Sequence, residues 1–284
     1  MNDMKLLQRA EINDEKWDEC VHESPFFRHY ALTSFLDAAC DNWMGLTDDN
    51  YSFVWPVPFK KFPVPRVYQP LLMQQLGPFG KEVIADQIKG GMNFLRARFT
   101  HIRIKFNDQV SRHQLDGNIE EHQNFELDLS PAYSIKRYNR TVQSNLKKSE
   151  KANLIIESSI EFDPWGIRAF KASKGKEVKV LTEQFYEQVK AVFQSFAAKD
   201  SALCYTAFIG DSKVAQVYLL NTNHRLLFLF SASNDLGKQF GAMHAVVDDI
   251  IKTYSGQNFV LDFEGSNAEG LAYFYAGFRA ERKV

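Results

Sequence analysis

The chain has 284 residues, of which 45% are hydrophobic and 24% charged, an ordinary composition for a globular protein that excludes disordered and fibrous classes. Its formal net charge is only -1, which gives no general attraction to nucleic acid or anionic lipid. Any polyanion site must therefore be local. No apolar run approaches the roughly 20 residues of a bilayer span. The first residues lack the basic start and apolar block of a signal peptide, so a cytoplasmic protein is expected.

The cysteines and histidines show no metal-binding pattern. Cys20, Cys40 and Cys204 are far apart, odd in number and free of C-x-x-C spacing, so neither a disulfide framework nor a zinc site is predicted. The sequence also lacks a Walker loop, a Rossmann glycine fingerprint and a Gly-x-Ser-x-Gly elbow. NTPase, dehydrogenase and hydrolase functions therefore lack their simplest sequence evidence.

Apolar periodicity and turn residues predict one element order in the first half: strand, helix, helix, three strands, helix, strand. Four prolines between Pro56 and Pro65 impose extended or looped backbone there. The predicted strands are 5–12, 43–46, 53–59, 67–76 and 101–106, with 124–129 closing the half, and the predicted helices are 13–23, 30–40 and 81–99.

Most of the same order is predicted again in the second half, where the turns 210–212 and 221–223 favour hairpins. The predicted strands are 202–209, 213–220, 225–232 and 259–263, the predicted helices are 182–198, 241–254 and 268–275, and a further strand is expected from 279. The length accommodates two domains of roughly 130 to 150 residues, each large enough to bury a core.

The segment 259–280 carries the clearest pattern. Acids alternate along an apolar strand, Gly265-Ser266 ends it, and a short aromatic helix follows that ends at Gly277. This segment resembles the end of an acyltransferase domain of the GNAT superfamily, in which a strand splayed from its neighbour opens a slot for an acyl donor. Residues 274–280 (Phe-Tyr-Ala-Gly-Phe-Arg-Ala) are similar to the Phe-Lys-x-x-Phe-Gly-Ala segment of FemABX-like proteins, with Tyr275 in place of Lys and Arg279 in place of Gly.

FemABX-like proteins carry two GNAT domains in one chain. The resemblance therefore implies an α+β protein with two GNAT-like domains, each a mixed, mostly antiparallel sheet flanked by helices. We expect an N-terminal domain at 1–130, a basic helical linker at 131–155 and a C-terminal domain with the donor site at 156–284.

A concentrated basic patch lies at 131–152, where six Lys and Arg residues accompany a single acid, Glu150. Residues 138–154 resemble the basic helix that enters the second domain of FemABX-like proteins, near which those proteins place their substrate. Cations would bind phosphates there, and aromatic side chains would stack on a base or ring. The alternative is a solvated basic helix that joins two domains. The substrate-binding residues predicted here are Arg137, Tyr138, Arg140, Asn145, Lys147 and Lys148.

The segment 231–242 runs from a strand end into a helix, and free N–H groups at a helix N-terminus suit a pyrophosphate. GNAT enzymes hold coenzyme A at this position, so the resemblance implies a donor-binding role. The spacing Gly237-x-x-x-Gly241-Ala242 departs from the usual Arg/Gln-x-x-Gly-x-Gly/Ala pattern and disfavours acyl-CoA, whereas the near-neutral charge disfavours aminoacyl-tRNA. Both donors stay open, and an ordinary capped loop is the alternative. The predicted donor-binding residues are Ser231, Ser233, Gly237, Lys238, Gln239, Phe240, Gly241 and Ala242.

N-acyl transfer needs a base that deprotonates the amine and an acid that protonates the leaving group. Asp262 and Glu264 are predicted to share a strand face, with Glu264 at the strand end acting as base through water. Tyr273 lies four residues before Gly277, matching the GNAT tyrosine that protonates the leaving thiolate, and Tyr275 is the second candidate. The alternative is that both tyrosines pack in the core and the acids are paired.

These features predict an N-acyltransferase that moves an acetyl or aminoacyl group to an amine of a small molecule, amino sugar or cell-envelope precursor. Gln74 and Gln75, on an otherwise apolar strand of the first domain, are expected to face the substrate. Acyl-CoA is the expected donor, with aminoacyl-tRNA as the alternative. The rival function is a catalytically degenerate GNAT-fold protein that binds a ligand or acts as a scaffold.

Overall fold

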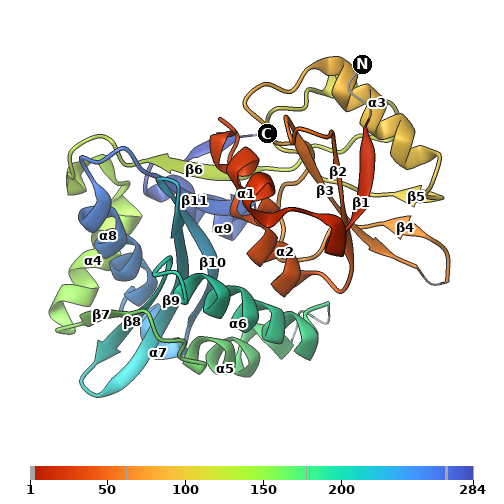
Figure 1. Cartoon of the computed structure of the whole chain (residues 1–284). Helices are drawn as coiled ribbons and strands as arrows, with labels where there is room; N and C mark the ends of the chain where they lie inside the picture. Colours follow the sequence, from red (N-terminus) through yellow and green to blue (C-terminus); the bar gives the residue numbers. More distant parts are fainter. Residues whose placement is uncertain (1–3, 62, 177, 179, 266–267, 284) are drawn as a thin grey trace. The chain divides into compact units, whose positions relative to one another are not determined.

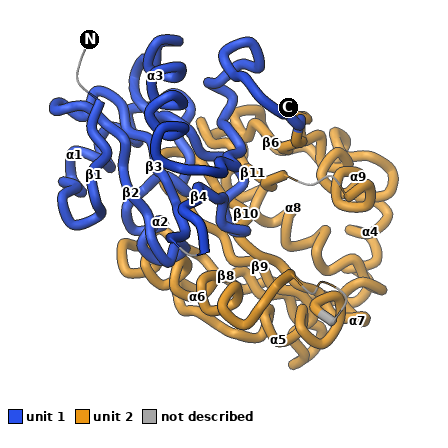
Figure 2. Tube along the Cα trace, turned by 90° about the vertical axis from the view of Figure 1, so that its right-hand side faces the viewer, with its two compact units in different colours: residues 1–121 blue, residues 122–284 orange. Residues whose placement is uncertain are grey.

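The computed structural model describes residues 4–61, 63–176, 178, 180–265 and 268–283 (Figure 1). The chain divides into two compact units, residues 1–121 and 122–284 (Figure 2). Each unit has its own sheet.

The first unit contains a five-stranded sheet of order β1-β2-β3-β4-β5. Neighbouring strands are antiparallel except β4 and β5, which are parallel. Asn13 caps α1 as its position predicts, since its Oδ1 accepts the N–H of Lys16. The elements are β1 (Lys5–Gln8), η1 (Arg9–Glu11), α1 (Asp14–Glu23), η2 (His29–Ala31), α2 (Thr33–Ala39), β2 (Trp43–Thr47), β3 (Val54–Lys60), β4 (Arg66–Val67), α3 (Ala85–Arg96), β5 (His101–Ile102) and η3 (Arg112–Gln114).

The second unit contains a seven-stranded sheet of order β12-β6-β11-β10-β9-β8-β7. Among the strands described for this sheet, only β10 and β11 pair in parallel. The elements are β6 (Asn124–Asp128), η4 (Ile135–Arg137), α4 (Arg140–Lys151), β7 (Ile155–Ser159), α5 (Trp165–Ala172), η5 (Lys174–Lys176), α6 (Glu183–Ala197), β8 (Ala202–Ile209), β9 (Ser212–Thr222), β10 (Arg225–Ser233), α7 (Asp235–Gln239), α8 (Ala242–Tyr254), β11 (Val260–Gly265), α9 (Glu269–Gly277) and β12 (Glu281–Lys283).

The two units repeat one topology. The order β1-α1-α2-β2-β3-β4-α3-β5 of the first unit recurs as β7-α5-α6-β8-β9-β10-α8-β11 in the second, apart from short turns of helix. The pairing recurs as well, with three antiparallel pairs followed by one parallel pair. The predicted fold class, two α+β units that each carry a mixed, mostly antiparallel sheet, is confirmed.

The boundary between the units differs from the expected domain limits. Strand β6, expected to close the first domain, lies in the second sheet between β11 and β12. Its register pairs Leu127 with Leu261 and Asp128 with Val260. The expected linker 131–155 also belongs to the second unit, where α4 packs against α8. In this position Phe125 and Leu127 are buried in the core of the second unit.

Several predicted elements differ in length. The strands expected at 67–76 and 101–106 are the two-residue strands β4 and β5, and the helix expected at 81–99 is the shorter α3. Beyond Val67 the backbone leaves the ladder, and Pro70 and Met73 form a turn. Strand β7 and helix α5 are elements that the apolar pattern did not indicate.

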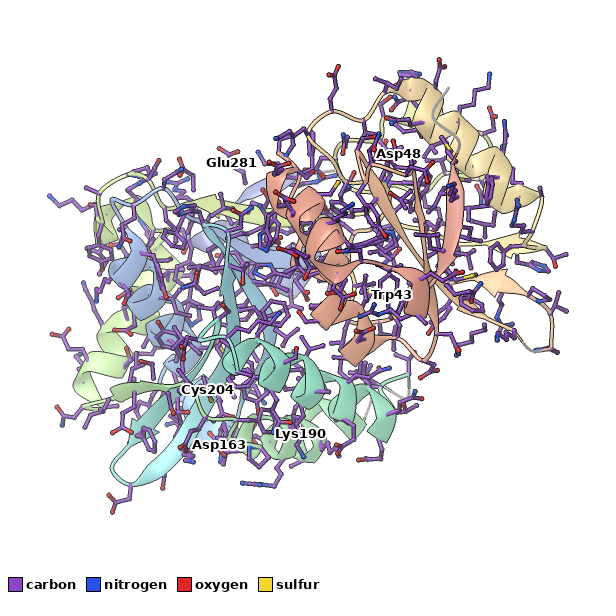
Figure 3. All side chains as sticks on the ribbon, in the orientation of Figure 1. Trp43, Asp48, Asp163, Lys190, Cys204 and Glu281 are labelled. Carbon is purple, nitrogen blue, oxygen red and sulfur yellow. The ribbon has the colours of Figure 1, made fainter. Side chains whose placement is uncertain are left out.

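Two polar anchors fix α5 to the sheet of the second unit. Asp163, labelled in Figure 3, accepts hydrogen bonds from Lys213 Nζ at 2.5 Å and Gln216 Nε2 at 2.9 Å. Its backbone carbonyl accepts the Tyr218 hydroxyl at 2.6 Å. Gln216 Oε1 in turn accepts the N–H of Gly166 at 2.6 Å. These hydrogen bonds connect the start of α5 to β9 and satisfy the polar groups buried between them.

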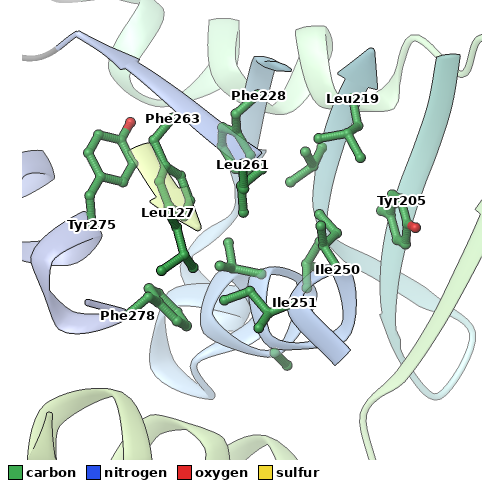
Figure 4. Close-up of a cluster of buried hydrophobic side chains, with 14 of the residues drawn as sticks. Leu127, Tyr205, Leu219, Phe228, Ile250, Ile251, Leu261, Phe263, Tyr275 and Phe278 are labelled. Carbon is green, nitrogen blue, oxygen red and sulfur yellow. The ribbon is translucent and has the colours of Figure 1, made fainter. Parts of the chain in front are cut away.

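Apolar side chains from β6, β9, β10, β11, α4, α8 and α9 form the core on the opposite face of this sheet (Figure 4). The core of the first unit joins Trp55 of β3 to Leu95 of α3. No helix within the described ranges combines the length and the apolar character that crossing a bilayer requires.

Two adjacent glycines of α3 offer a test of this packing. A Cβ at Gly91 would lie 2.6 Å from Cζ3 of Trp55, whereas one at Gly90 would meet only the flexible end of Met4, at 3.0 Å. Alanine is favoured over glycine by about 1 kcal/mol in a helix, but overpacking a core costs about 1–3 kcal/mol. We expect Gly91→Ala to lower the free energy of unfolding in urea and Gly90→Ala to raise it. Equal effects of the two changes would contradict the packing.

Candidate functional site

The parallel strands β10 and β11 pair over only three positions: Arg225 with Val260, Leu226 with Leu261 and Leu227 with Asp262. Immediately beyond, the pairing of β10 with β9 shifts at a bulge between Phe228 and Phe230. A bulge bends its strand and increases the local twist. Strands β10 and β11 therefore part toward their C-terminal ends, and this divergence is the geometric centre of the candidate site.

A buried ion cluster holds the point where the strands part. The Arg225 guanidinium donates to Asp262 Oδ2 from Nε at 3.1 Å and from Nη2 at 2.8 Å, and it also contacts Glu126. Burial lowers the pKa of Arg225, but the charges of Asp262 and Glu126 outweigh burial and raise it. Arg225 is therefore a permanent cation that joins β6, β10 and β11.

Glu264 lies just beyond the last parallel pair. Its backbone is left-handed, with φ of 63°, and its N–H donates to Asp262 Oδ1 at 2.9 Å. The prediction that Asp262 and Glu264 share one strand face is wrong, because this turn breaks the strand alternation after Phe263. Asp262 instead fixes the backbone that carries Glu264.

Tyr275 stands beside the end of β11. Its ring stacks on Phe263 with centroids 4.7 Å apart, and Figure 4 shows its hydroxyl pointing away from Phe278. Burial raises the pKa of Tyr275, and the nearby charge of Glu264 raises it further. Phe228 packs on Phe263 at 5.6 Å, so aromatic rings line the α8 face of the divergence.

Tyr273, the other predicted catalytic tyrosine, lies elsewhere. Its side chain is 59% exposed, and its hydroxyl is hydrogen-bonded to Thr141 Oγ1 of α4 at 2.9 Å. The helical spacing places Tyr273 on the outer side of α9 when Tyr275 faces the core. The structure therefore separates the two tyrosines and brings only Tyr275 beside the end of β11.

The predicted donor loop is not an open loop. The five-residue helix α7 interrupts it, and Asn234 caps that helix by accepting the N–H of Gly237 at 2.8 Å. A Cβ at Gly237 would lie 2.2 Å from the carbonyl oxygen of Val214, so this glycine is required by packing. The Ser233 hydroxyl donates to the same carbonyl at 3.1 Å. The Gly237 N–H and the Ser233 hydroxyl, which were expected to bind a pyrophosphate, are therefore already hydrogen-bonded within the fold.

The remaining loop residues lie around the start of α8. Lys238 forms an exposed ion pair with Asp235, and Ala242 is buried in the core. Ser231 and Phe240 are half-buried, and Gln239 is exposed.

The start of α8 lies against the basic helix α4. Gly241 caps α8 with φ of 69°, and a Cβ there would lie 2.7 Å from the carbonyl oxygen of Asn145. The Asn145 side chain is 3.4 Å from His244 Nε2 and accepts from Lys148 Nζ at 3.3 Å. The fold thus brings together two segments that the sequence suggested separately, the donor segment and the basic helix.

The cations of the basic patch are exposed: Arg137, Arg140, Lys147 and Lys148. The expectation that Tyr138 stacks on a substrate is wrong. Tyr138 is 5% exposed and packs edge-on against Phe278 at 5.2 Å.

In the first unit, Gln74 is half-buried and Gln75 is 7% exposed. Gln75 Oε1 accepts the Nε–H of Arg28 at 2.7 Å. The expectation that Gln75 faces a substrate is therefore replaced by a structural role, since it satisfies a buried guanidinium. Among the described residues, no group of three or more His, Cys, Asp or Glu side chains is arranged to hold a metal ion.

Arg225 and Glu126 were missing from the residues expected in the site. Their sequence signal was present, because Glu126, Arg225 and Asp262 are charged residues on otherwise apolar strands. A charge in a buried strand needs a partner of opposite sign. This requirement predicts that Arg225 pairs with Glu126 and Asp262.

Together these features define a tandem GNAT fold. The structure is similar to that of FemX, with a TM-score of 0.64 and 12% identity over 98% of this chain and 95% of that chain. It is similar to the C-terminal domain of a putative lysylphosphatidylglycerol synthetase from Agrobacterium fabrum, with a TM-score of 0.58 and 12% identity over 97% and 90% of the two chains. A tandem GNAT protein from the clavulanic acid biosynthesis pathway gives a TM-score of 0.52 and 10% identity over 98% and 95%.

At these identities the similarity shows the fold. No protein-family model matches the chain. No curated protein matches it in sequence.

His244 makes the stability of this region depend on pH. Burial, together with the charge of Lys148, lowers the pKa of His244 to about 4. Unfolded chains would bind a proton near the ordinary histidine pKa, so the unfolded state holds more protons between about pH 4 and 6.5. The free energy of unfolding should therefore fall as pH drops through this window, by at most about 1.4 kcal/mol per unit from this group.

The measurement is urea unfolding of the wild type and of His244→Gln across the same range. The variant keeps a polar side chain beside Asn145 but cannot titrate, so its unfolding energy should depend less steeply on pH. Identical slopes for both proteins would show that His244 titrates normally in the folded chain.

Proposed function

We propose that the chain is an N-acyltransferase that moves an acetyl or aminoacyl group from an activated carrier to an amine of a small molecule, amino sugar or cell-envelope precursor. The observation that carries the proposal is the divergence of β10 from β11 after three parallel pairs, next to the bulge in β10. The resemblance to GNAT enzymes gives such a divergence the role of a slot for the acyl donor.

The first unit supports placing the reaction in the second. Its parallel strands β4 and β5 also pair briefly, but the segments after them are joined again by a bridge between Leu76 and Phe106. Between these points Gln69 Oε1 accepts the N–H of Lys105 at 2.8 Å, and its Nε2 donates to the carbonyl of Met73 at 3.0 Å. The equivalent divergence in the first unit is thereby closed by a side chain.

In the proposed reaction, the amine nitrogen attacks the carbonyl carbon of the bound donor, and a C–N bond forms as the bond to the carrier breaks. Glu264 takes the proton that the amine loses, through water. Tyr275 keeps its proton at neutral pH because its pKa is raised, so it can donate to the departing thiolate or alkoxide. Holding the amine and the carbonyl in line would supply about 7–11 kcal/mol of the barrier reduction.

Two features support an anionic donor near the start of α8. The helix N-terminus carries partial positive charge. Lys148 of α4 donates a hydrogen bond to Asn145, whose backbone lies against Gly241 at the start of α8. Both donor classes agree with the names of structural neighbours, since one is a tandem GNAT protein whose name mentions AcCoA and another is the C-terminal domain of a putative lysylphosphatidylglycerol synthetase, a name that implies an aminoacyl group. Acyl-CoA is the donor proposed first, and aminoacyl-tRNA the alternative.

A specific observation favours a second candidate, a GNAT-fold protein that binds a ligand or acts as a scaffold without catalysis. The rings of Phe228, Phe263 and Tyr275 are buried at the divergence. The N–H of Gly237 and the hydroxyl of Ser233 are used inside the fold. A protein that had lost the chemistry would show such packing.

Donor binding distinguishes the two candidates. We expect acetyl-CoA, coenzyme A or aminoacyl-tRNA to raise the melting temperature, because a ligand at 100 times its Kd stabilises the folded state by about 2.7 kcal/mol. Lys148→Ala should weaken this stabilisation, whereas Lys151→Ala on the same helix should not. If none of the three ligands raises the melting temperature, the non-catalytic scaffold is the better candidate.

Catalytic roles are tested with a panel of primary amines and the donor that binds. Glu264→Gln should lower kcat by about 10²–10⁴-fold, the usual contribution of a general base, with donor affinity retained. Tyr275→Phe should lower kcat as well. Tyr273→Phe, a matched loss of one hydroxyl on the same helix, should leave kcat unchanged because that side chain is on the outer surface. Full activity of both Glu264→Gln and Tyr275→Phe would refute the assignment.

A further inference from the structure

Charge is strongly segregated in the first unit. Residues 50–81 and 87–107 contain no Asp or Glu. The same two stretches supply strands β3, β4 and β5 and most of helix α3. Their cations are Lys60, Lys61, Arg66, Lys81, Lys89, Arg96, Arg98, Arg103 and Lys105. A chain with net charge of -1 therefore carries a local basic region that its average conceals.

The strand register gathers part of this charge into one row. Lys60 of β3 lies opposite Arg66 of β4, and Arg66 lies opposite His101 of β5. Residues opposite each other share a sheet face, and strand alternation adds Arg103 to it. We name this set, Lys60, Arg66, His101 and Arg103, the basic face. Figure 1 shows β4 and β5 at the edge of the first sheet.

The opposite side of the same strands is apolar. Phe59, Val67 and Ile102 occupy the adjacent register positions and pack with Leu95 and Phe99 in the core of the unit. The core therefore fixes the orientation of these strands and turns the basic face outward. Arg66, His101 and Arg103 are exposed, and Lys60 is half-buried.

The basic face is not neutralised by the unit itself. Lys81 and Arg96 form ion pairs with Glu23 and Asp116. Within the described part of the chain, Lys60, Arg66 and Arg103 have no such pair. Like charges opposite each other destabilise a sheet, so this row is unfavourable for folding alone. An external anion would remove that repulsion.

We infer that the basic face docks the first unit onto an anionic lipid surface. The lipid is favoured over nucleic acid by exposed apolar side chains in the segments that flank β4, since Val64, two residues before it, is 40% exposed and Leu71, in the turn that follows it, is 51% exposed. A bilayer interface accepts aliphatic side chains next to cations, whereas a phosphodiester backbone offers them no apolar contact.

The aromatic ring beside Lys60 also favours the lipid. Lys60 Nζ lies 4.8 Å from the ring centre of Tyr68. This half-buried ring already holds a cation on its face and is therefore a poor platform for base stacking, on which single-stranded nucleic acid binding depends.

The test is cosedimentation of the full chain with vesicles of phosphatidylcholine alone and with added phosphatidylserine. We expect binding only to the anionic vesicles, weakening as salt rises. Each cation near such a surface changes the partition coefficient about fivefold, so Arg66→Ala/Arg103→Ala should lower it about 25-fold. The matched control Arg168→Ala/Lys199→Ala removes the same charge from the second unit and should bind as the wild type does.

Thermal melts establish that both double variants are folded before binding is compared. Equal loss in the two variants would overturn the proposal, because only net charge would then matter. Binding to neutral vesicles to the same extent would overturn it too. Binding to duplex RNA at the same phosphate concentration, without binding to anionic vesicles, would assign the basic face to nucleic acid instead.

Discussion

The second unit depends on the contact of one guanidinium with two carboxylates. Arg225 joins Asp262 and Glu126 across three adjacent strands. Arg225 belongs to the first of the three parallel pairs of β10 with β11, and Asp262 belongs to the last. Buried charges tolerate the loss of a partner poorly, at about 3–5 kcal/mol when one member is removed. The cluster therefore fixes β6 beside β11 and fixes where the parallel strands begin to separate.

Separation of paired strands leaves backbone groups without partners, and the two units resolve this differently. In the second unit Asp262 accepts the N–H of Glu264, two residues further along the same strand. In the first unit Gln69 accepts the N–H of Lys105 on the opposite segment. A partner on the same strand leaves the two strands apart, whereas a partner across the gap ties them together. The two units share one topology, but the parallel strands diverge in the second unit, where Asp262 bonds to its own strand, and stay joined in the first, where Gln69 bonds across the gap.

Elements governed by local chemistry were predictable from the sequence. The hairpins of β8, β9 and β10 follow from the turns at Gly210 and Asn223, whose positive φ values suit their residue types. Helices α6 and α8 follow from their apolar spacing. The element order of the first unit was likewise predictable, and so was that of the second from α6 onward, whereas β7 and α5 were not indicated by the apolar pattern.

Long-range partners were not predictable in the same way. Strand β6 has an apolar pattern that suits either sheet, and only its register with β11 decides between them. Gly237 and Gly241 were interpreted through a phosphate-binding pattern, but each is required where another backbone approaches closely. Tyr273 and Tyr275 are distinguished by which side of a short helix meets the core, a choice that the aromatic residues on both sides of α9 obscure.

The distribution of charge explains why the average of the chain is a poor guide to its ligands. The cations of α4 and those of the basic face belong to different units, and acidic segments such as α1 balance them in the total. Screening over about 8 Å at physiological ionic strength keeps each set of charges local. An anionic group near α4 therefore responds to Lys148 and the start of α8, and a surface near β4 responds to Arg66 and Arg103. Two separate electrostatic sites can exist on a chain of almost zero net charge for this reason.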